Sequence, residues 1–149
     1  MKNQPDLPVS GYISCKKRIK KMNSCIVSLG SNIDSEKNIA EALRLIAANF
    51  QLIKASRFIK TKPIGMADQP DFTNGAVLIR TEINLENLTS ALKKIEDQMG
   101  RDRTKAKFGP RNIDLDILVW NGEVIDQDYF TRDFLRASAD ELGFKTEKI

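Results

Sequence analysis

Two carboxylates, Asp114 and Asp116, are the side chains with the clearest chemical potential in this chain. They alternate with apolar residues in NIDLDILV, and this period of two predicts a β-strand that carries both carboxylates on one face. Residues two apart on a strand lie roughly 6.5 Å from each other, so the carboxylates repel unless a cation lies between them. Oxygen ligands at this spacing suit Mg²⁺, which binds one or two carboxylates together with water and phosphate oxygens.

The segment just before this strand, residues 100–112, is expected to be a loop that binds phosphate. It contains Gly109 and Pro110, and its cationic side chains are Arg101, Arg103, Lys105, Lys107 and Arg111. Phosphoryl transfer uses metal ions to neutralise charge and arginine or lysine to hold phosphate oxygens. A pair of aspartates on an edge strand often has no metal role, but the neighbouring cations favour a Mg²⁺-phosphate site.

The composition excludes several other kinds of site. The chain of 149 residues has no histidine and only two cysteines, so it lacks the commonest general base and any disulfide or Cys/His metal framework. The few cysteines indicate a reducing, cytoplasmic location. Residues 1–23 carry six cationic side chains against one carboxylate, so the net charge of +4 belongs largely to this segment. We therefore expect no general nucleic-acid-binding face.

The chain is expected to have a basic, flexible tail at residues 1–23 and a single domain at residues 24–149. The tail contains KKRIKK at 16–21, and no apolar stretch long enough for a signal peptide or a membrane span follows it. We expect a monomer that neither is exported nor binds membranes. Met22 is a candidate translation start, because it closely precedes the first apolar segment.

Hydrophobic periodicity predicts an α+β domain. Strand patterns occur at 25–29, 51–61, 71–83 and 113–120, and helical patterns at 36–49 and between Asn84 and Gly100. Ser35 and Asn84 are candidate N-caps, and Gly75 suggests a bulge or a close approach. The order β-α-β-β-α-β is that of the ferredoxin-like fold, a four-stranded antiparallel sheet with both helices on one face. After Trp120, NGEVID predicts a C-terminal hairpin, while 127–144 is ambiguous, with a candidate helix at 137–142.

Five motifs together resemble a known enzyme family. They are LGSN at 29–32, T-x-P-x-G at 61–65, DQPDFTN at 68–74, IE…GR at 95–101 and FGPRNIDLDIL at 108–118. Over about residues 24–134 the chain resembles the 6-hydroxymethyl-7,8-dihydropterin pyrophosphokinases of folate biosynthesis. The resemblance implies the fold above, ATP as co-substrate and two Mg²⁺ ions. It also implies transfer of a pyrophosphoryl group from ATP to the pterin hydroxymethyl, with release of AMP.

The resemblance also assigns residues to the site. Asp114 and Asp116 match the metal ligands. The residues that match the family's ATP-binding positions are Arg101, Arg103, Phe108, Arg111 and Arg132. The residues that match its pterin-binding positions are Thr61, Ile64, Phe72, Asn74 and Phe134. Of these, Arg101, Arg111, Asp114 and Asp116 are the implied catalytic residues, and Glu96 matches a glutamate near the site.

The pterin assignment also fits the residue types. A flat ring stacks well between two phenyl faces, here those of Phe72 and Phe134, and the amide of Asn74 can both donate and accept hydrogen bonds. The alternative is that both phenylalanines belong to the core and that Asn74 forms a turn.

The chain departs from the family pattern in one segment. Members usually carry a Pro-His dipeptide, whose histidine contacts ATP, between the hairpin and an R-x-F motif, whereas YFTRDF at 129–134 passes straight on. The chain is thus a shortened variant, and a non-catalytic pterin- or nucleotide-binding paralogue stays open as an alternative. A further alternative is an RNA-binding module on the same sheet, but the paired aromatic residues of an RNP motif are absent.

Overall fold

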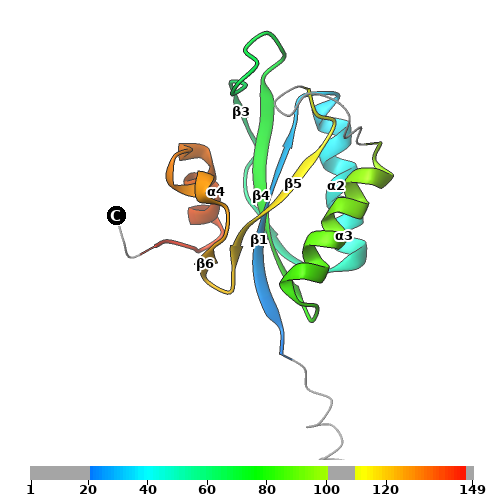
Figure 1. Cartoon of the computed structure of the whole chain (residues 1–149), viewed down its shortest axis with the longest axis vertical. Coiled ribbons are helices and arrows are strands. Elements are labelled where there is room, and N and C mark those ends of the chain that lie inside the picture. The colour runs from blue at the N-terminus through cyan, green and yellow to red at the C-terminus, as the bar shows by residue number, and fades with distance from the viewer. Residues whose placement is uncertain (1–20, 101–109, 147–149) are drawn as a thin grey trace, which may run out of the picture.

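The computed structural model of the chain describes residues 21–100 and 110–146. Residues 1–20 of the predicted tail therefore lie outside the described residues, as do Arg101, Arg103 and Phe108. In the described part, an antiparallel sheet lies between two helices on one face and a third helix on the other (Figure 1). The predicted α+β class is confirmed.

Strands and helices are both spread along the described part of the chain. The elements are β1 (Asn23–Ser31), α2 (Ser35–Asn49), β2 (Gln51–Ala55), β3 (Ile59–Thr61), β4 (Phe72–Thr81), α3 (Leu85–Gln98), β5 (Asp114–Trp120), β6 (Glu123–Val124), the 3-10 helix η1 (Gln127–Phe130) and α4 (Asp133–Glu141). Within the described residues, none of these helices is long and apolar enough to cross a membrane.

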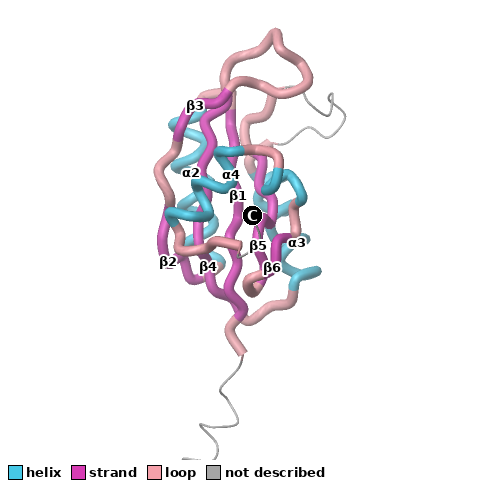
Figure 2. The backbone as a smooth tube through the Cα atoms, turned by 90° about the vertical axis from the view of Figure 1, so that its left-hand side faces the viewer, coloured by secondary structure: helices cyan, strands magenta, loops and turns pink. Residues whose placement is uncertain are grey.

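Within residues 21–100 and 110–146 the sheet contains six strands, whereas the sequence predicted a four-stranded sheet with a C-terminal hairpin extension. Strands β2, β4, β1 and β5 lie side by side in this order, and β6 extends the sheet beyond β5 (Figure 2). The remaining strand, β3, pairs with β4. The hairpin predicted after Trp120 is confirmed. Asn121 and Gly122 have φ values of 48° and 84°, and this pair of positive angles forms the tight turn between β5 and β6.

The prediction of one continuous strand at 51–61 is wrong, because the regular pairing with β4 is interrupted at Ser56 and the segment forms two strands, β2 and β3. Ser56 N donates to Ala76 O at 2.8 Å, and the Ser56 hydroxyl accepts from Ala76 N at 2.9 Å. The hydroxyl thus replaces a backbone acceptor and separates β2 from β3. The Phe58 ring then packs over Gly75, where a Cβ would lie 2.5 Å from a ring carbon. The predicted close approach at Gly75 is therefore confirmed.

Strand β1 lies at the centre of the sheet and packs against both layers. Cys25, Val27 and Leu29 belong to the core under α2 and α3, whereas Ile26 belongs to a second core under α4. Burial raises the pKa of the Cys25 thiol to about 12. The thiol therefore stays protonated near neutral pH, which makes Cys25 a packing residue rather than a nucleophile.

Helices α2 and α3 begin differently from each other. Asn84 is the predicted N-cap of α3, and its side chain accepts from Asn87 N at 2.8 Å. The predicted N-cap of α2, Ser35, is wrong. Asp34 precedes the helix in the left-handed conformation, with φ of 43°, and Ser35 is the first helical residue. The Ser35 hydroxyl instead donates to Ser31 O at 2.7 Å, because the turn after β1 brings that carbonyl within reach.

Helix α4 covers part of the opposite face of the sheet, where the sequence had suggested only a short helix at 137–142. Its buried residues Leu135 and Ala139 pack in one cluster with Ile26 and Leu118 of the sheet. The C-terminal end of α4 is fixed to the 56–58 segment, because Arg57 N donates to a Glu141 carboxylate oxygen at 2.9 Å. This hydrogen bond is the main reason that the pKa of Glu141 is lowered.

Candidate active site

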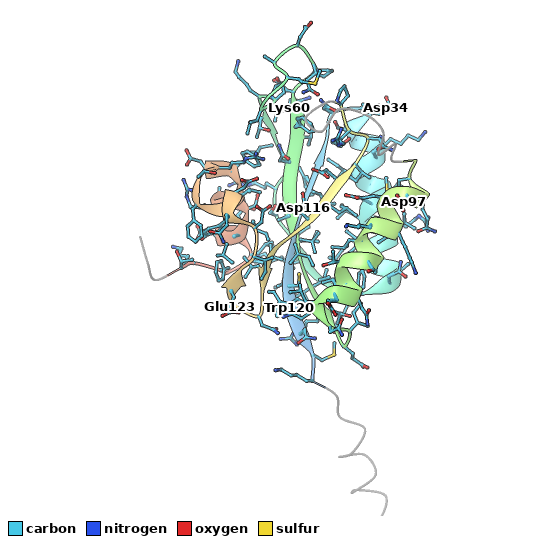
Figure 3. The ribbon with its side chains drawn as sticks, in the orientation of Figure 1. Asp34, Lys60, Asp97, Asp116, Trp120 and Glu123 are labelled. Carbon is cyan, nitrogen blue, oxygen red and sulfur yellow. The ribbon has the colours of Figure 1, made fainter. Side chains whose placement is uncertain are left out.

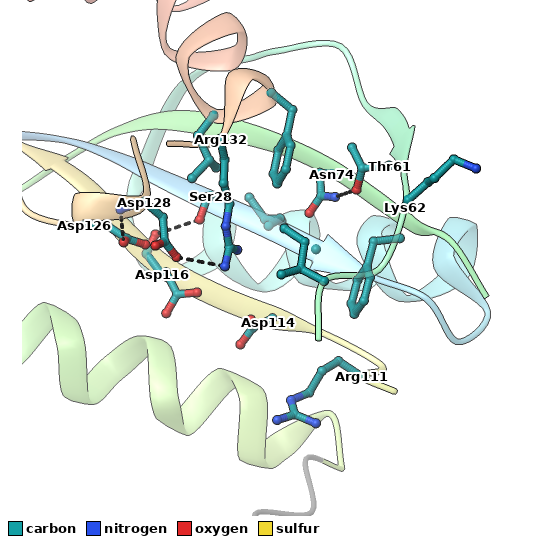
Figure 4. A pocket seen from close by; sticks show the side chains of 16 residues that line it. Ser28, Thr61, Lys62, Asn74, Arg111, Asp114, Asp116, Asp126, Asp128 and Arg132 are labelled. Atoms are coloured by element: carbon teal, nitrogen blue, oxygen red, sulfur yellow. Dashed lines mark hydrogen bonds and ion pairs between the residues drawn. The ribbon is translucent and has the colours of Figure 1, made fainter. Parts of the chain in front are cut away.

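One cavity on the α4 face of the sheet brings the predicted site residues together. Its volume is about 330 Å³. Every predicted site residue that the structure describes lines it: Thr61, Ile64, Phe72, Asn74, Arg111, Asp114, Asp116, Arg132 and Phe134. The other three, Arg101, Arg103 and Phe108, lie outside the described residues. Residues that are far apart in the sequence therefore meet in one place (Figure 4).

The floor of the cavity consists of rows of residues that run across β4, β1 and β5. Asn74, Gly30 and Asp114 form one such row, and Ser28 faces Asp116 in the next row. A Cβ at Gly30 would lie 2.6 Å from Asn74 Oδ1. Glycine at this position therefore leaves room between the amide of Asn74 and the carboxylate of Asp114.

Asp114 and Asp116 share the cavity face of β5, as the alternating sequence predicted. Leu115, which lies between them, points the other way and is buried in the core under α2 and α3. Asp116 is exposed and Asp114 is half-buried, and Figure 3 labels Asp116 in the middle of the sheet. Both carboxylates thus line the cavity rather than the core under α2 and α3.

This pair of carboxylates fits a hard divalent cation. Within residues 21–100 and 110–146, no group of three or more His, Cys, Asp or Glu side chains could hold a metal ion. A cation at Asp114 and Asp116 would therefore complete its coordination shell with water or substrate oxygens. Mg²⁺ binds in this way, since it keeps several waters and takes few protein ligands.

A buried glutamate on α3 holds the beginning of β5 in place. Glu96 is 4% exposed, and its Oε2 accepts from Leu115 N at 2.7 Å. A buried carboxylate is costly unless it accepts hydrogen bonds, so this contact fixes both the glutamate and the strand. Because Leu115 lies between Asp114 and Asp116, this hydrogen bond also restrains the backbone that carries the two aspartates. The family resemblance implied that Glu96 lies near the site but did not indicate this contact.

A second buried polar residue, Asn32, connects Arg111 to the loop before β4. Asn32 is 5% exposed. Its Oδ1 accepts from Arg111 N at 2.8 Å, and its own N donates to Arg111 O at 3.0 Å. Its Nδ2 donates to Gln69 Oε1 at 2.8 Å and to Pro70 O at 3.0 Å. Sequence reasoning missed this role, although Asn32 lies in the LGSN motif.

The aromatic end of the cavity contains Phe72, Phe134 and Asn74. The amide nitrogen of Asn74 donates to the Thr61 hydroxyl, which fixes the orientation of the amide (Figure 4). Phe72 is half-buried, and the core clusters of the described residues do not include it. Phe134 packs at the edge of the core under α4. The alternative of a purely structural role therefore fits Phe134 better than Phe72.

The cavity also contains charged residues that the sequence did not predict. Asp126 and Asp128 add two carboxylates to the lining, and Lys62 adds a cation to those of Arg111 and Arg132. Arg132 Nη2 lies 3.3 Å from Asp128 Oδ2. No local pattern marks these residues, because they come from the turn between β6 and α4 and from the loop after β3.

The sequence matches the model of the 7,8-dihydro-6-hydroxymethylpterin-pyrophosphokinase family over residues 26–143. The chain belongs to this family. The match covers most of the chain and extends past the motifs through α4. The resemblance based on five motifs is thus confirmed for the pyrophosphokinase family.

Individual pyrophosphokinases show the same relationship. A Haemophilus influenzae protein named 2-amino-4-hydroxy-6-hydroxymethyldihydropteridine pyrophosphokinase is 36% identical over 113 residues, which are 74% of this chain and 70% of that protein. A Bacillus subtilis protein of the same name is 39% identical over 107 residues, 70% of this chain and 64% of that protein. A folate synthesis bifunctional protein of Arabidopsis thaliana is 37% identical over 105 residues, 69% of this chain and 22% of that protein.

Proposed function

We propose that this chain transfers pyrophosphate from ATP to 6-hydroxymethyl-7,8-dihydropterin and releases AMP, in a domain of ferredoxin-like fold. Membership of the pyrophosphokinase family supports the reaction. The observation that carries the proposal for this chain is the single cavity in which the β5 carboxylates and Arg111 meet Phe72, Asn74 and Phe134. The cavity therefore offers groups suited to both substrates.

The acidic end of the cavity would bind the polyphosphate together with two Mg²⁺ ions. Asp114 and Asp116 would hold the metal, which when bound neutralises phosphate charge and activates the attacking hydroxyl. Arg111, with Arg101, would stabilise charge on the phosphates through bidentate hydrogen bonds. Arg103, Phe108 and Arg132 would complete the ATP site. No histidine is needed for these roles.

The aromatic end would bind the pterin. The rings of Phe72 and Phe134 offer faces for stacking, and Ile64 and Thr61 line the same cavity. The amide of Asn74 would pair with polar atoms on the edge of the pterin ring. Because the amide is already oriented by Thr61, a ring that lacks those polar atoms would leave it unpaired and would bind weakly.

Incubation of the protein with ATP, Mg²⁺ and 6-hydroxymethyl-7,8-dihydropterin is expected to give AMP and pterin diphosphate in equal amounts. Omission of the pterin is the control, since AMP formed without it would come from a contaminating hydrolase. Binding of both ligands with no AMP would favour the alternative of a non-catalytic paralogue, which the missing Pro-His segment suggests.

Replacing Phe72 by alanine is expected to weaken pterin binding by roughly 1 to 3 kcal/mol, if ring stacking here resembles stacking on nucleic-acid bases. Affinity for ATP should not change. The measurement is the Kd of each ligand by calorimetry. Phe130→Ala is the matched control, because this ring is 50% exposed and lies outside the cavity lining. Equal pterin affinity in both variants would assign Phe72 to packing alone.

We also propose that residues 24–149 form one domain that acts as a monomer in the cytoplasm, with residues 1–23 as a basic tail. ATP and the pterin would be its small-molecule partners, and nucleic acid or membrane would not be. The low cysteine content supports a reducing compartment. Some plant relatives are named as mitochondrial proteins, so the compartment is not uniform among relatives.

A further inference from the structure

The turn between β6 and α4 presents a carboxylate, Asp128, whose role the proposed function leaves open. This turn is the 3-10 helix η1, and Asp126 begins it by accepting from Asp128 N at 3.0 Å. The carbonyl of Asp128 accepts from Arg132 N at 2.9 Å. The turn therefore fixes the backbones of Asp128 and Arg132 relative to each other.

The side chains of the same two residues also form an ion pair. Arg132 Nη2 lies 3.3 Å from Asp128 Oδ2, with the arginine side chain 31% exposed and the aspartate side chain 46% exposed. Figure 4 shows the Arg132 side chain reaching from the beginning of α4 into the cavity that Asp116 also lines, with Asp128 beside its guanidinium. Asp128 thus contacts Arg132 through both its backbone and its side chain.

The surroundings of Arg132 explain why such a partner would be useful. An arginine side chain has about 2 kcal/mol of rotamer entropy, so a partner that restrains it reduces the cost of binding a ligand later. The other carboxylates that line the cavity include Asp114 and Asp116. An arginine that paired with those two would occupy the place proposed for a metal ion.

We propose that Asp128 is a positioning residue that holds Arg132 over the cavity for the ATP polyphosphate and keeps it away from Asp114 and Asp116. The inference rests on the proposed function in one respect, namely that Arg132 contacts ATP. Residues 128–132 would then support ATP binding in the segment where this chain lacks the family's Pro-His dipeptide. Asp128 itself does not contact substrate.

The substitution Asp128→Asn separates this role from a simple charge effect, because the two predict opposite changes. Four carboxylates of the described residues line the cavity, so the loss of one charge alone should strengthen the binding of the ATP polyanion. Loss of Arg132 positioning should instead raise the Kd for ATP about fivefold, as expected for one partly exposed ion pair. The measurement is the Kd for ATP with Mg²⁺ by calorimetry, together with the KM for ATP.

Two matched variants control for charge and for folding. Asp126→Asn removes the same charge from the same cavity and keeps an oxygen that can cap η1, so its Kd for ATP should not rise. Asp133→Asn breaks a different ion pair at the beginning of α4, that with Arg136, and should leave ATP binding unchanged. All three variants should have the unfolding midpoint of the original protein.

A double-mutant cycle with Arg132→Ala distinguishes failure of this inference from failure of the proposed function. Arg132→Ala should raise the Kd for ATP, and adding Asp128→Asn to it should cause no further rise. A rise from Asp128→Asn that persists without Arg132, or no rise in Asp128→Asn alone, would overturn the positioning role. An unchanged Kd in Arg132→Ala would instead remove Arg132 from the ATP site, and Asp128 with it.

Discussion

Replacing Asp116 by alanine is expected to lower kcat by about 100- to 1,000-fold, which corresponds to about 2.7 to 4 kcal/mol of lost transition-state stabilisation. Asp116 is exposed on the cavity face of β5 and takes no part in either core, so the fold should persist. The loss arises because a single remaining carboxylate would hold the metal poorly. The measurement is AMP release at saturating ATP and pterin, with the thermal midpoint as a check of folding.

The control for this substitution is Glu123→Ala. Glu123 is an exposed carboxylate on the partner strand β6 and lies outside the cavity lining, so turnover should be retained. Asp114→Ala in the Asp116→Ala background should add little, because two ligands of one ion act as a unit. Near-normal turnover of Asp116→Ala would refute the assignment of the metal site.

Replacing Glu96 by alanine is expected to reduce the free energy of unfolding by about 1 to 3 kcal/mol, because Leu115 N would lose its acceptor in a buried place. A loss of this size lowers the unfolding midpoint by roughly 4 °C per kcal/mol for a chain of this length. Turnover should fall as well, since Leu115 lies between Asp114 and Asp116. Chemical denaturation and AMP release measure the two effects.

Two further variants test whether the lost hydrogen bond causes the loss of stability in Glu96→Ala. Asp97→Ala changes the next residue of α3, an exposed carboxylate, and should alter stability by less than about 0.5 kcal/mol. Glu96→Gln keeps an oxygen that can accept from Leu115 N and should recover most of the stability. If both Glu96 variants were as stable as Asp97→Ala, the hydrogen bond from Leu115 N to Glu96 would not contribute to the stability of the fold.

The sequence predicted those parts of the fold whose signals are local. Alternation of Asp114 and Asp116 with apolar residues was enough to place both on one face of a strand, because a strand has a period of two. Asn84 was correctly identified as an N-cap since its partner, Asn87 N, is only three residues away. The site residues came from the family motifs, which combine segments that the fold then brings together.

The features that the sequence did not predict depend on contacts over long distances in the chain. The interruption between β2 and β3 arises from a hydrogen bond between the Ser56 hydroxyl and Ala76 N. Hydrophobic periodicity is a local pattern and cannot indicate a partner 20 residues away. Asn32 meets Arg111 from 79 residues away. Helix α4 was underestimated because its apolar residues are few, and it is stabilised mainly by packing on Ile26 and Leu118.

Strand β1 has a consequence for how this protein can respond to its ligands. It pairs with β4 on one side and β5 on the other, so the backbone beneath Ser28 and Gly30 is held on both edges. Segments held in this way open only with much of the domain, whereas loops and short turns open at little cost. Adaptation to an incoming ligand is therefore confined to the rim of the cavity, and its base acts as a fixed template.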